Sequence, residues 1–398
     1  MSSIRRGRHL AAASLSAGLI ALVLAASAAA EPGPQWSGLD ARAYAGPIPA
    51  EGDLITSVPL DPALSVTGAA NAFRILYATP DQHARPAVST AAVFVPHGAP
   101  PAGGWPVIAW AHGTVGLGDD CTPSARPRSP RDNEYLSHWL DQGYVVVGTD
   151  YVGLGTPGLM SYLNSATEAH SVIDSVRAVH QMDLPLSPKW AIVGQSQGGG
   201  AAINSAWWAS RLTAGTGLDY RGVVATGTPA NIERLVMEAG PDLPPQAVPP
   251  AAISYTSYIV AALREAHPEI PLDSVLTPRG RELADRAETV CKTELDQQVA
   301  GTTLHELFSA PVSSLDGIGA ALDRFMGTPT DGYDRPIFLG HGLRDTDVPP
   351  RSSQTLYQQL IDNGENVELH IYPDQDHSGT VLASMPDSTR FLHQLMTG

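Results

Sequence analysis

A serine framed by glycines stands near the middle of this 398-residue chain, in the run Gly194-Gln195-Ser196-Gln197-Gly198. The residues before it, Trp190 to Val193, are apolar like a buried strand, and the small residues after it are typical of a helix start. A tight turn from strand to helix needs glycines two positions from the serine, because larger side chains would collide with both elements. The pattern predicts a nucleophilic serine presented at a helix N-terminus.

A serine attacks a carbonyl group only when a base removes its proton, and a histidine oriented by a carboxylate is suited to that task. Asp345 follows the short apolar run Pro336 to Leu339, and His377 follows Val367 to Tyr372, so each candidate lies in a loop after a predicted strand. The chain order serine, aspartate, histidine also fits a strand-turn-helix nucleophile. We therefore predict a catalytic triad of Ser196, Asp345 and His377.

Other residues near these positions have simpler interpretations. Asp347 is the alternative triad acid, but its place before Pro349 is also typical of an Asx turn or a helix N-cap. His112 and His341 also follow predicted strands, and each precedes a glycine, so we expect them to pack in the loops around the site. Tyr151 is at best a residue that lines the pocket.

The negative oxygen that forms during acyl transfer needs hydrogen-bond donors. The backbone N–H of Gln197 is one candidate, because it lies at the start of the helix where the dipole favours negative charge. We nominate the backbone N–H of Thr114, in the loop 111–116, as the second. These parts complete acyl transfer without a metal or an organic cofactor, so we expect neither.

The segments around these residues alternate between strands and helices, which predicts a parallel sheet covered on both faces. Further strands are expected at Ala72 to Ala78, Ala87 to Val95, Pro106 to Ala111, Tyr144 to Gly148 and Gly222 to Ala225. Helices are expected at Asn133 to Asp141, Ala166 to Gln181, Ser196 to Arg211, Ser352 to Asn363 and from about Asp387. With the order of the catalytic candidates, this pattern predicts the α/β-hydrolase fold, with a mainly parallel central sheet flanked by helices.

The segment 231–330 interrupts the alternation, because it is rich in helical patterns and proline, and we predict an inserted helical cap. The stretch Tyr255 to Ala266 is either a mobile lid helix or an ordinary buried cap helix. The predicted organisation is a signal peptide at 1–30, an N-terminal extension at 31–69, core segments at 70–230 and 331–398, and the cap between them.

The N-terminus predicts secretion. Arginines 5, 6 and 8 precede an apolar run and an alanine-rich end, so we expect signal-peptide cleavage near Ala28 to Ala30. Loss of three arginines and no acid would change the formal charge from −16 to −19, which disfavours nucleic acid as a partner. In an oxidising compartment the two cysteines, Cys121 and Cys291, are expected to form a disulfide.

Several of these runs together resemble the secretory lipases of the lipase A type. The resemblance rests on His112-Gly113-Thr114, Cys121-Thr122-Pro123-Ser124, Asp150-Tyr151-x-Gly-Leu-Gly, Gly-Gln-Ser-Gln-Gly and His-Gly-x-x-Asp-x-x-Val-Pro, and it spans about residue 70 to the C-terminus. It implies a capped hydrolase that acts on lipids and other carboxylic esters through Ser196, Asp345 and His377. It also supports the Cys121 to Cys291 pairing, whereas the cap and Leu159 to Tyr162 depart from the family pattern.

The same triad supports other reactions, so alternatives stay open at this point. An acyltransferase or a peptidase would use identical groups, and an inactive binding protein on the same scaffold would need a broken triad. Acidic residues that could anchor a peptide amine exist in the cap, but they also suit solvated helix faces: Glu233, Glu238, Glu265 and Glu269. We expect a monomer that acts on small esters or lipids, with transient contact to a lipid interface.

Overall fold

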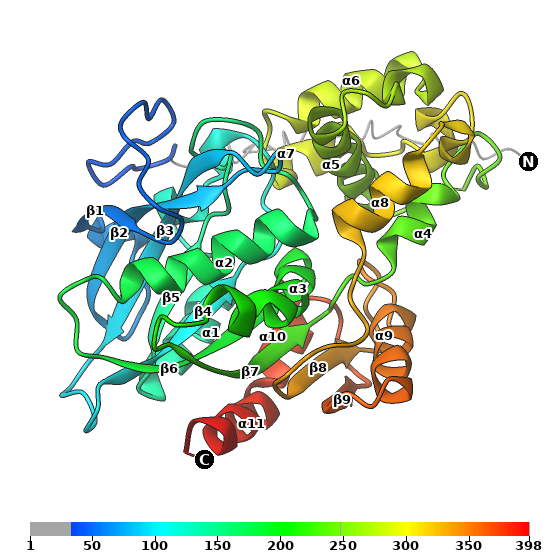
Figure 1. The fold of residues 1–398 in the computed structure, drawn as a ribbon. Helices are drawn as coiled ribbons and strands as arrows, with labels where there is room; N and C mark the ends of the chain where they lie inside the picture. Colours follow the sequence, from blue (N-terminus) through cyan, green and yellow to red (C-terminus); the bar gives the residue numbers. More distant parts are fainter. Residues whose placement is uncertain (1–32, 247, 398) are drawn as a thin grey trace, which may run out of the picture. The chain divides into compact units, whose positions relative to one another are not determined.

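The computed structural model describes residues 33–246 and 248–397, and these form one nine-stranded sheet with helices around it (Figure 1). The predicted signal peptide and its cleavage point lie outside the described residues. In sheet order the strands are β1 (Leu54–Pro59), β2 (Ala69–Pro80), β3 (Pro86–Pro96), β5 (Val145–Thr149), β4 (Trp105–Ala111), β6 (Leu186–Gln195), β7 (Asp219–Thr226), β8 (Ile337–Gly342) and β9 (Val367–Tyr372).

The strand pairing is mainly parallel, as predicted. From β5 through β4, β6, β7 and β8 to β9 every neighbouring pair is parallel, whereas β1, β2, β3 and β5 pair antiparallel. The strands of the parallel part are short and buried on both faces. In β5, for example, Val145 and Val147 pack on one face of the sheet and Val146 on the other. This arrangement explains why these strands are continuous apolar runs in the sequence.

Helices cover both faces of the sheet. The flanking helices are α1 (Pro130–Asp141), α2 (Ser165–Val179), α3 (Gln197–Leu212), α9 (Arg351–Asp362), α10 (Gly379–Ala383) and α11 (Met385–Thr397). The side chains of α2 and α3 belong to one apolar core, and those of α1 and α11 belong to the core on the opposite face. Parallel strands bring their carboxyl ends to one edge, so the loops after β4, β6, β8 and β9 meet there.

Among the described residues, five α-helices lie between β7 and β8, in the segment predicted to form a cap. They are α4 (Ile232–Met237), α5 (Pro250–Ala266), α6 (Pro278–Ala287), α7 (Lys292–Gln298) and α8 (Ile318–Met326). Figure 1 shows α4, α5, α6 and α8 grouped on the right, with α7 nearer to the strands. The proposed domain boundaries and the cap role of this group stay predictions.

Apart from the short 3-10 helices and the helices of the inserted segment, β1 and α10 had no predicted range. Strand β1 lies inside the predicted N-terminal extension, and its residues are only partly buried because it forms the edge of the sheet. Its apolar pattern is therefore too weak to detect from sequence. Helix α10 has only five residues, which is too short for a helical period to be visible. Among residues 33–246 and 248–397, no helix is long and apolar enough to cross a membrane.

Candidate active site

Ser196 occupies the turn between β6 and α3 with a left-handed backbone, at φ 59° and ψ −125°. Few residues other than glycine adopt this conformation, and strain of this kind is concentrated at functional sites. The Ser196 N–H donates to the carbonyl oxygen of Thr226 at 2.9 Å, which ties the turn to β7. A Cβ added to Gly194 would overlap Gly198, and one added to Gly198 would overlap Ala111, so both glycines are sterically required.

Asp345 lies in the loop after β8 and is 5% exposed. Its Oδ1 accepts the backbone N–H groups of Asp347 at 2.9 Å and Val348 at 2.8 Å. Burial alone would raise the pKa of this carboxyl, but hydrogen bonds from His341 and His377 hold the pKa well below its usual range. Asp345 is therefore ionised at neutral pH.

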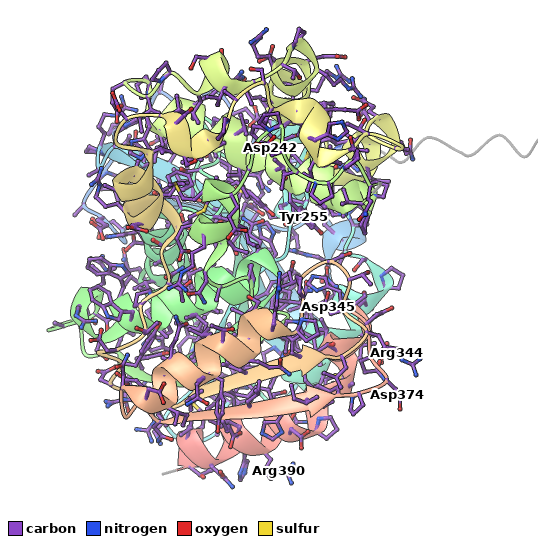
Figure 2. All side chains as sticks on the ribbon, turned by 90° about the vertical axis from the view of Figure 1, so that its right-hand side faces the viewer. Asp242, Tyr255, Arg344, Asp345, Asp374 and Arg390 are labelled. Carbon is purple, nitrogen blue, oxygen red and sulfur yellow. A yellow bond between two sulfur atoms is a disulfide. The ribbon has the colours of Figure 1, made fainter. Side chains whose placement is uncertain are left out.

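The alternative acid, Asp347, faces a different neighbour. Its Oδ2 lies 3.5 Å from the hydroxyl of Tyr255, which belongs to α5. Figure 2 shows Tyr255 on the side of the inserted helices and Asp345 on the side of the sheet. The histidine contact belongs to Asp345, which supports the original choice between the two acids.

His377 lies between β9 and α10, and its Nδ1 is 2.6 Å from Oδ2 of Asp345. Because Asp345 is ionised, this nitrogen carries the proton that forms the bond. The ring packs against the backbone of Gly227, where an added Cβ would come within 2.9 Å of the imidazole. His377 Nε2 lies 3.0 Å from the side-chain amide nitrogen of Gln195, so this nitrogen faces the turn that holds Ser196.

The loop after β4 also reaches the serine. A Cβ placed on Gly113 would lie 3.4 Å from Cβ of Ser196, so its backbone passes close to the nucleophile. Thr114 is half-buried, and its hydroxyl lies 2.7 Å from that of Tyr162. Gln197 is the first residue of α3 and is buried. The two nominated donors therefore come from the expected loop and helix, and their oxyanion role stays a prediction.

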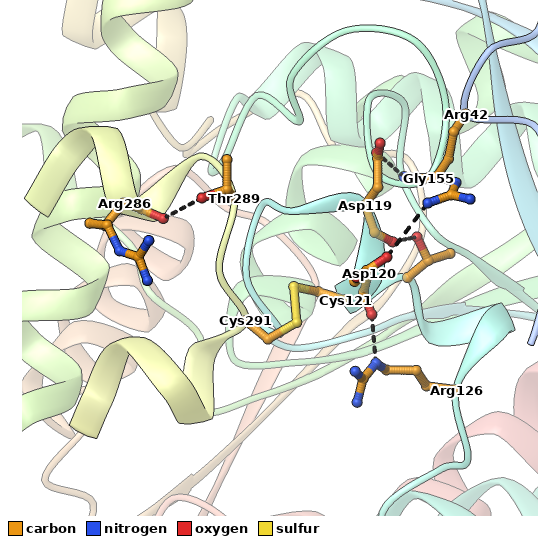
Figure 3. Close-up of a disulfide and its surroundings, with 10 residues drawn as sticks. Arg42, Asp119, Asp120, Cys121, Arg126, Gly155, Arg286, Thr289 and Cys291 are labelled. Atoms are coloured by element: carbon orange, nitrogen blue, oxygen red, sulfur yellow. Dashed lines mark hydrogen bonds and ion pairs between the residues drawn. A yellow bond between two sulfur atoms is a disulfide. The ribbon is translucent and has the colours of Figure 1, made fainter. Parts of the chain in front are cut away.

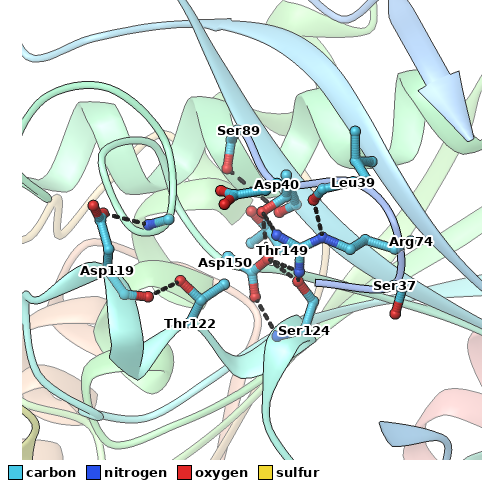
Figure 4. A network of polar contacts seen from close by, with 12 residues as sticks. Ser37, Leu39, Asp40, Arg74, Ser89, Asp119, Thr122, Ser124, Thr149 and Asp150 are labelled. Carbon is cyan, nitrogen blue, oxygen red and sulfur yellow. Dashed lines mark hydrogen bonds and ion pairs between the residues drawn. The ribbon is translucent and has the colours of Figure 1, made fainter. Parts of the chain in front are cut away.

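Tyr151 does not line the cavity next to Ser196, contrary to the role considered from sequence. It is 1% exposed, and its hydroxyl donates to the carbonyl oxygen of His112 at 3.1 Å. The preceding residue, Asp150, accepts from the backbone N–H of Ser124 at 2.8 Å and from the hydroxyl of Thr90 at 2.6 Å. Figure 4 shows the contact between Asp150 and Ser124. Tyr151 therefore supports the loop that carries the predicted oxyanion donor.

The expected disulfide between Cys121 and Cys291 is present (Figure 3). It connects the loop before α1 to the residue that precedes α7, across 170 positions of sequence. Next to it, the backbone N–H of Lys292 donates to the carbonyl oxygen of Val115 at 2.8 Å. The bond therefore joins the inserted helices to the loop that follows Thr114.

Glu168, on α2, is a buried acid to which the sequence analysis gave no role. It is 2% exposed, and its Oε1 accepts from Nε2 of Gln197 at 2.7 Å and from the backbone N–H of Leu163 at 3.0 Å. Burial raises the pKa of this carboxyl to about 8, although both hydrogen bonds oppose the rise. Glu168 thus connects the side chain of a predicted oxyanion residue to the loop before α2.

A cavity of about 660 Å³ opens next to Ser196 and Gln197, and its lining is mostly apolar. Helices α4 and α5 supply part of its other walls, including Leu235, Tyr255 and Ile259, and residues from the segment 347–355 after β8 supply another part. Most of α5 is buried, and the choice between a cap helix and a mobile lid stays a prediction. In α4, by contrast, no residue is buried and Leu235 is 48% exposed, so α4 is the less firmly packed wall.

A cluster of possible metal ligands occurs elsewhere, on α2 and the segment before β1. Ligand atoms of Glu51, His170 and Asp174 lie within 4.8 Å of one another. However, Arg177 Nη1 lies 2.9 Å from Asp174 and 3.7 Å from Glu51, so a cation already pairs with both carboxylates. We interpret this cluster as an ion-paired contact between α2 and the N-terminal segment.

Two family models match the chain. The secretory lipase model matches residues 130–242, which include Ser196, and the prolyl oligopeptidase family model matches residues 325–396, which include Asp345 and His377. Both matched segments therefore contain residues predicted to be catalytic.

Curated relatives and solved structures point in the same direction. A secreted triacylglycerol lipase of Malassezia globosa is 26% identical over 272 residues, which cover 65% of this chain and just over half (54%) of that protein. Lipase A of Moesziomyces aphidis is 23% identical over 379 residues, covering 88% of this chain and 77% of that protein.

Two solved structures share the fold. The closed state of Candida antarctica lipase A has a TM-score of 0.69 and 19% identity, over 92% of this chain and 85% of that one. A rice cell wall degrading esterase of Xanthomonas oryzae has a TM-score of 0.70 and 20% identity, over 87% of this chain and 100% of that one. These likenesses confirm the predicted α/β-hydrolase fold.

Proposed function

We propose that this chain, which belongs to the lipase A-like secretory lipases, is an exported serine hydrolase that cleaves carboxylic esters with apolar acyl groups. One observation carries the proposal. Ser196, held in a left-handed turn, lines a mostly apolar cavity, and the nearby His377 is hydrogen-bonded to the ionised Asp345. A nucleophile, its base and a place for an acyl chain therefore lie together.

In the proposed reaction, His377 Nε2 accepts the proton of Ser196 as the serine oxygen attacks the ester carbonyl. Asp345 stays ionised and stabilises the imidazolium that forms, because its Oδ2 accepts the Nδ1 proton of His377 at 2.6 Å. The imidazolium then gives its proton to the departing alkoxide. Water repeats the two steps on the acyl-enzyme and releases the carboxylic acid.

Before the serine can give up its proton, one hydrogen bond must change. The amide nitrogen of Gln195 lies 3.0 Å from His377 Nε2 and donates to the lone pair that accepts the proton of Ser196. A small rotation of the Gln195 side chain frees this nitrogen. The backbone N–H groups of Gln197 and Thr114 are the proposed donors to the oxyanion.

The proposed substrates are small esters and lipids, because the mostly apolar cavity next to Ser196 suits an acyl chain. We assign transient contact with a lipid interface to α4, whose apolar side chains are not buried, with Leu235 the most exposed of them. We further propose a monomer that is exported after signal-peptide cleavage near Ala28 to Ala30.

Hydrolysis of p-nitrophenyl esters with acyl chains from two to sixteen carbons tests this function. We expect activity in the exported protein and its loss in Ser196→Ala. Ser205→Ala is the matched control on the same helix, because the Ser205 hydroxyl donates only to the Ala201 carbonyl of its own helix, at 2.7 Å. A folded protein that hydrolyses no ester in the series would refute the proposal.

A peptidase remains the second candidate, because the prolyl oligopeptidase family model matches residues 325–396. Of the predicted triad, that segment contains only the acid, Asp345, and the base, His377. Their roles are the same in ester and amide cleavage. The apolar lining next to Ser196 favours an acyl chain over a charged peptide amine. Amino-acid p-nitroanilides separate the candidates, since a peptidase would cleave them faster than the matching esters of simple fatty acids.

A further inference from the structure

A second histidine, His341, contacts the triad acid in addition to His377. His341 lies near the end of β8 and is fully buried. Its Nε2 is 3.1 Å from Oδ2 of Asp345, the same oxygen that accepts the Nδ1 proton of His377. Asp345 Oδ2 is therefore shared by two imidazole rings.

The other contacts of His341 determine where its proton lies. Its Nε2 is also 3.0 Å from the carbonyl oxygen of Val348, so both neighbours of this nitrogen are acceptors. Its Nδ1 lies 2.7 Å from the hydroxyl of Ser353, which can donate. Since both neighbours of Nε2 are acceptors, the arrangement requires that Nε2 carries a proton, and the hydroxyl of Ser353 holds the other ring nitrogen. His341 thus donates from Nε2 toward Asp345.

We propose that His341 is a positioning residue for the triad acid: it holds Oδ2 of Asp345 in line with His377 and reduces the negative charge on that oxygen. This inference rests on the proposed roles of Asp345 and His377. The N–H groups of Asp347 and Val348 already fix the other oxygen, Oδ1. At Oδ2, His341 adds a second donor to that of His377, so donors on both oxygens keep the carboxylate from rotating about its Cβ–Cγ bond. Ser353 in turn orients the ring of His341.

This role has a consequence for the base that simple packing would not have. While His341 donates to Oδ2, the negative charge available to His377 is reduced. Without that donor, Asp345 would stabilise the protonated ring of His377 more strongly. Removal of His341 should therefore make His377 take up a proton at a higher pH.

Histidine NMR of the ¹⁵N-labelled exported protein tests this inference without substrate turnover. In His341→Leu we expect the pH at which His377 protonates to rise by about one unit, because a hydrogen bond to a charged group is worth about a tenfold factor. His341→Gln keeps a side-chain N–H donor and should restore most of the original behaviour. His370→Gln, on the neighbouring strand β9, is the matched control and should leave His377 unchanged.

Ester kinetics give a second readout. We expect kcat in His341→Leu to fall about tenfold with KM within about twofold, because the lost contact acts on the base and not on substrate binding. If His341→Leu does not fold, Ser353→Ala is measured instead. That variant keeps His341 but removes the hydroxyl that orients its ring. The pH at which His377 takes up a proton is then expected to rise by a smaller amount.

The two proposals fail in different ways. An inactive protein whose His377 still responds to His341→Leu would overturn the ester hydrolase proposal and leave this inference standing. A folded His341→Leu or Ser353→Ala variant in which His377 protonates at the original pH would overturn the inference, whatever the ester activity.

Discussion

The buried carboxyl of Glu168 should make the stability of this protein fall as the pH rises. Its pKa is raised by burial from 4.5 to about 8 in the folded protein. The folded state therefore holds a proton that the unfolded chain releases more easily. The contribution of Glu168 is fully present below pH 4.5 and is lost as the pH rises through 8.

The size of this effect follows from the two pKa values. Each tenfold change in an acid constant corresponds to about 1.4 kcal/mol, so the rise from 4.5 to about 8 amounts to on the order of 5 kcal/mol. Glu168→Gln removes the ionisation while its amide oxygen can still accept from Gln197 and Leu163. We expect the variant to gain stability relative to the native chain by on the order of 5 kcal/mol between pH 4 and pH 9.

Urea unfolding at pH steps from 4 to 9, with the disulfide intact, measures this difference. Asp174 is also buried with a raised pKa, but it is present in both proteins and its contribution cancels. Glu134→Gln, at an exposed position on α1, is the control and should follow the native chain. A stability difference between Glu168→Gln and the native chain that stays constant with pH would refute the reasoning.

Two further predictions concern the acid and the disulfide. Asp345→Asn should lower kcat by about 10⁴-fold because the imidazole loses its ionised partner, whereas Asp347→Asn should change it by less than about tenfold; equal losses in steady-state kinetics would contradict this assignment. Replacing Cys121 and Cys291 by serine opens a connection across 170 residues and should lower the free energy of unfolding by about 5 kcal/mol, measured by urea titration. An unchanged unfolding midpoint would show that the bond does not constrain the unfolded chain.

The turn around Ser196 was predictable because its determinants are local. The apolar strand, the two glycines and the helix start are contiguous in sequence, and each has a steric reason that the structure bears out. The parallel strands were predictable for a similar reason, since burial on both faces leaves continuous apolar runs. Strand β1 has neither such a run nor the regular apolar-polar alternation that made the other edge strand, β9, predictable.

The contacts of the site depend on tertiary structure and left no signal that sequence reasoning used. His341 was expected only to pack in a loop, yet it lies 3.1 Å from Asp345. Gln195 was seen only as part of the glycine-serine motif, and its contact with His377 bridges 182 positions of sequence. Glu168 was one acid in a helical pattern. The one clue available was that His341 stands four residues before Asp345, which lies in the loop after the strand.

The central claim is that Ser196 is a nucleophile activated by His377, and a phosphonate probe tests it most directly. The exported protein is incubated with a p-nitrophenyl alkylphosphonate, p-nitrophenolate release is counted, and the modified peptide is identified by mass spectrometry. We predict one equivalent of release with the label on Ser196, and little release in His377→Gln. A folded protein that takes up no label, or takes it up at another residue, would contradict the claim.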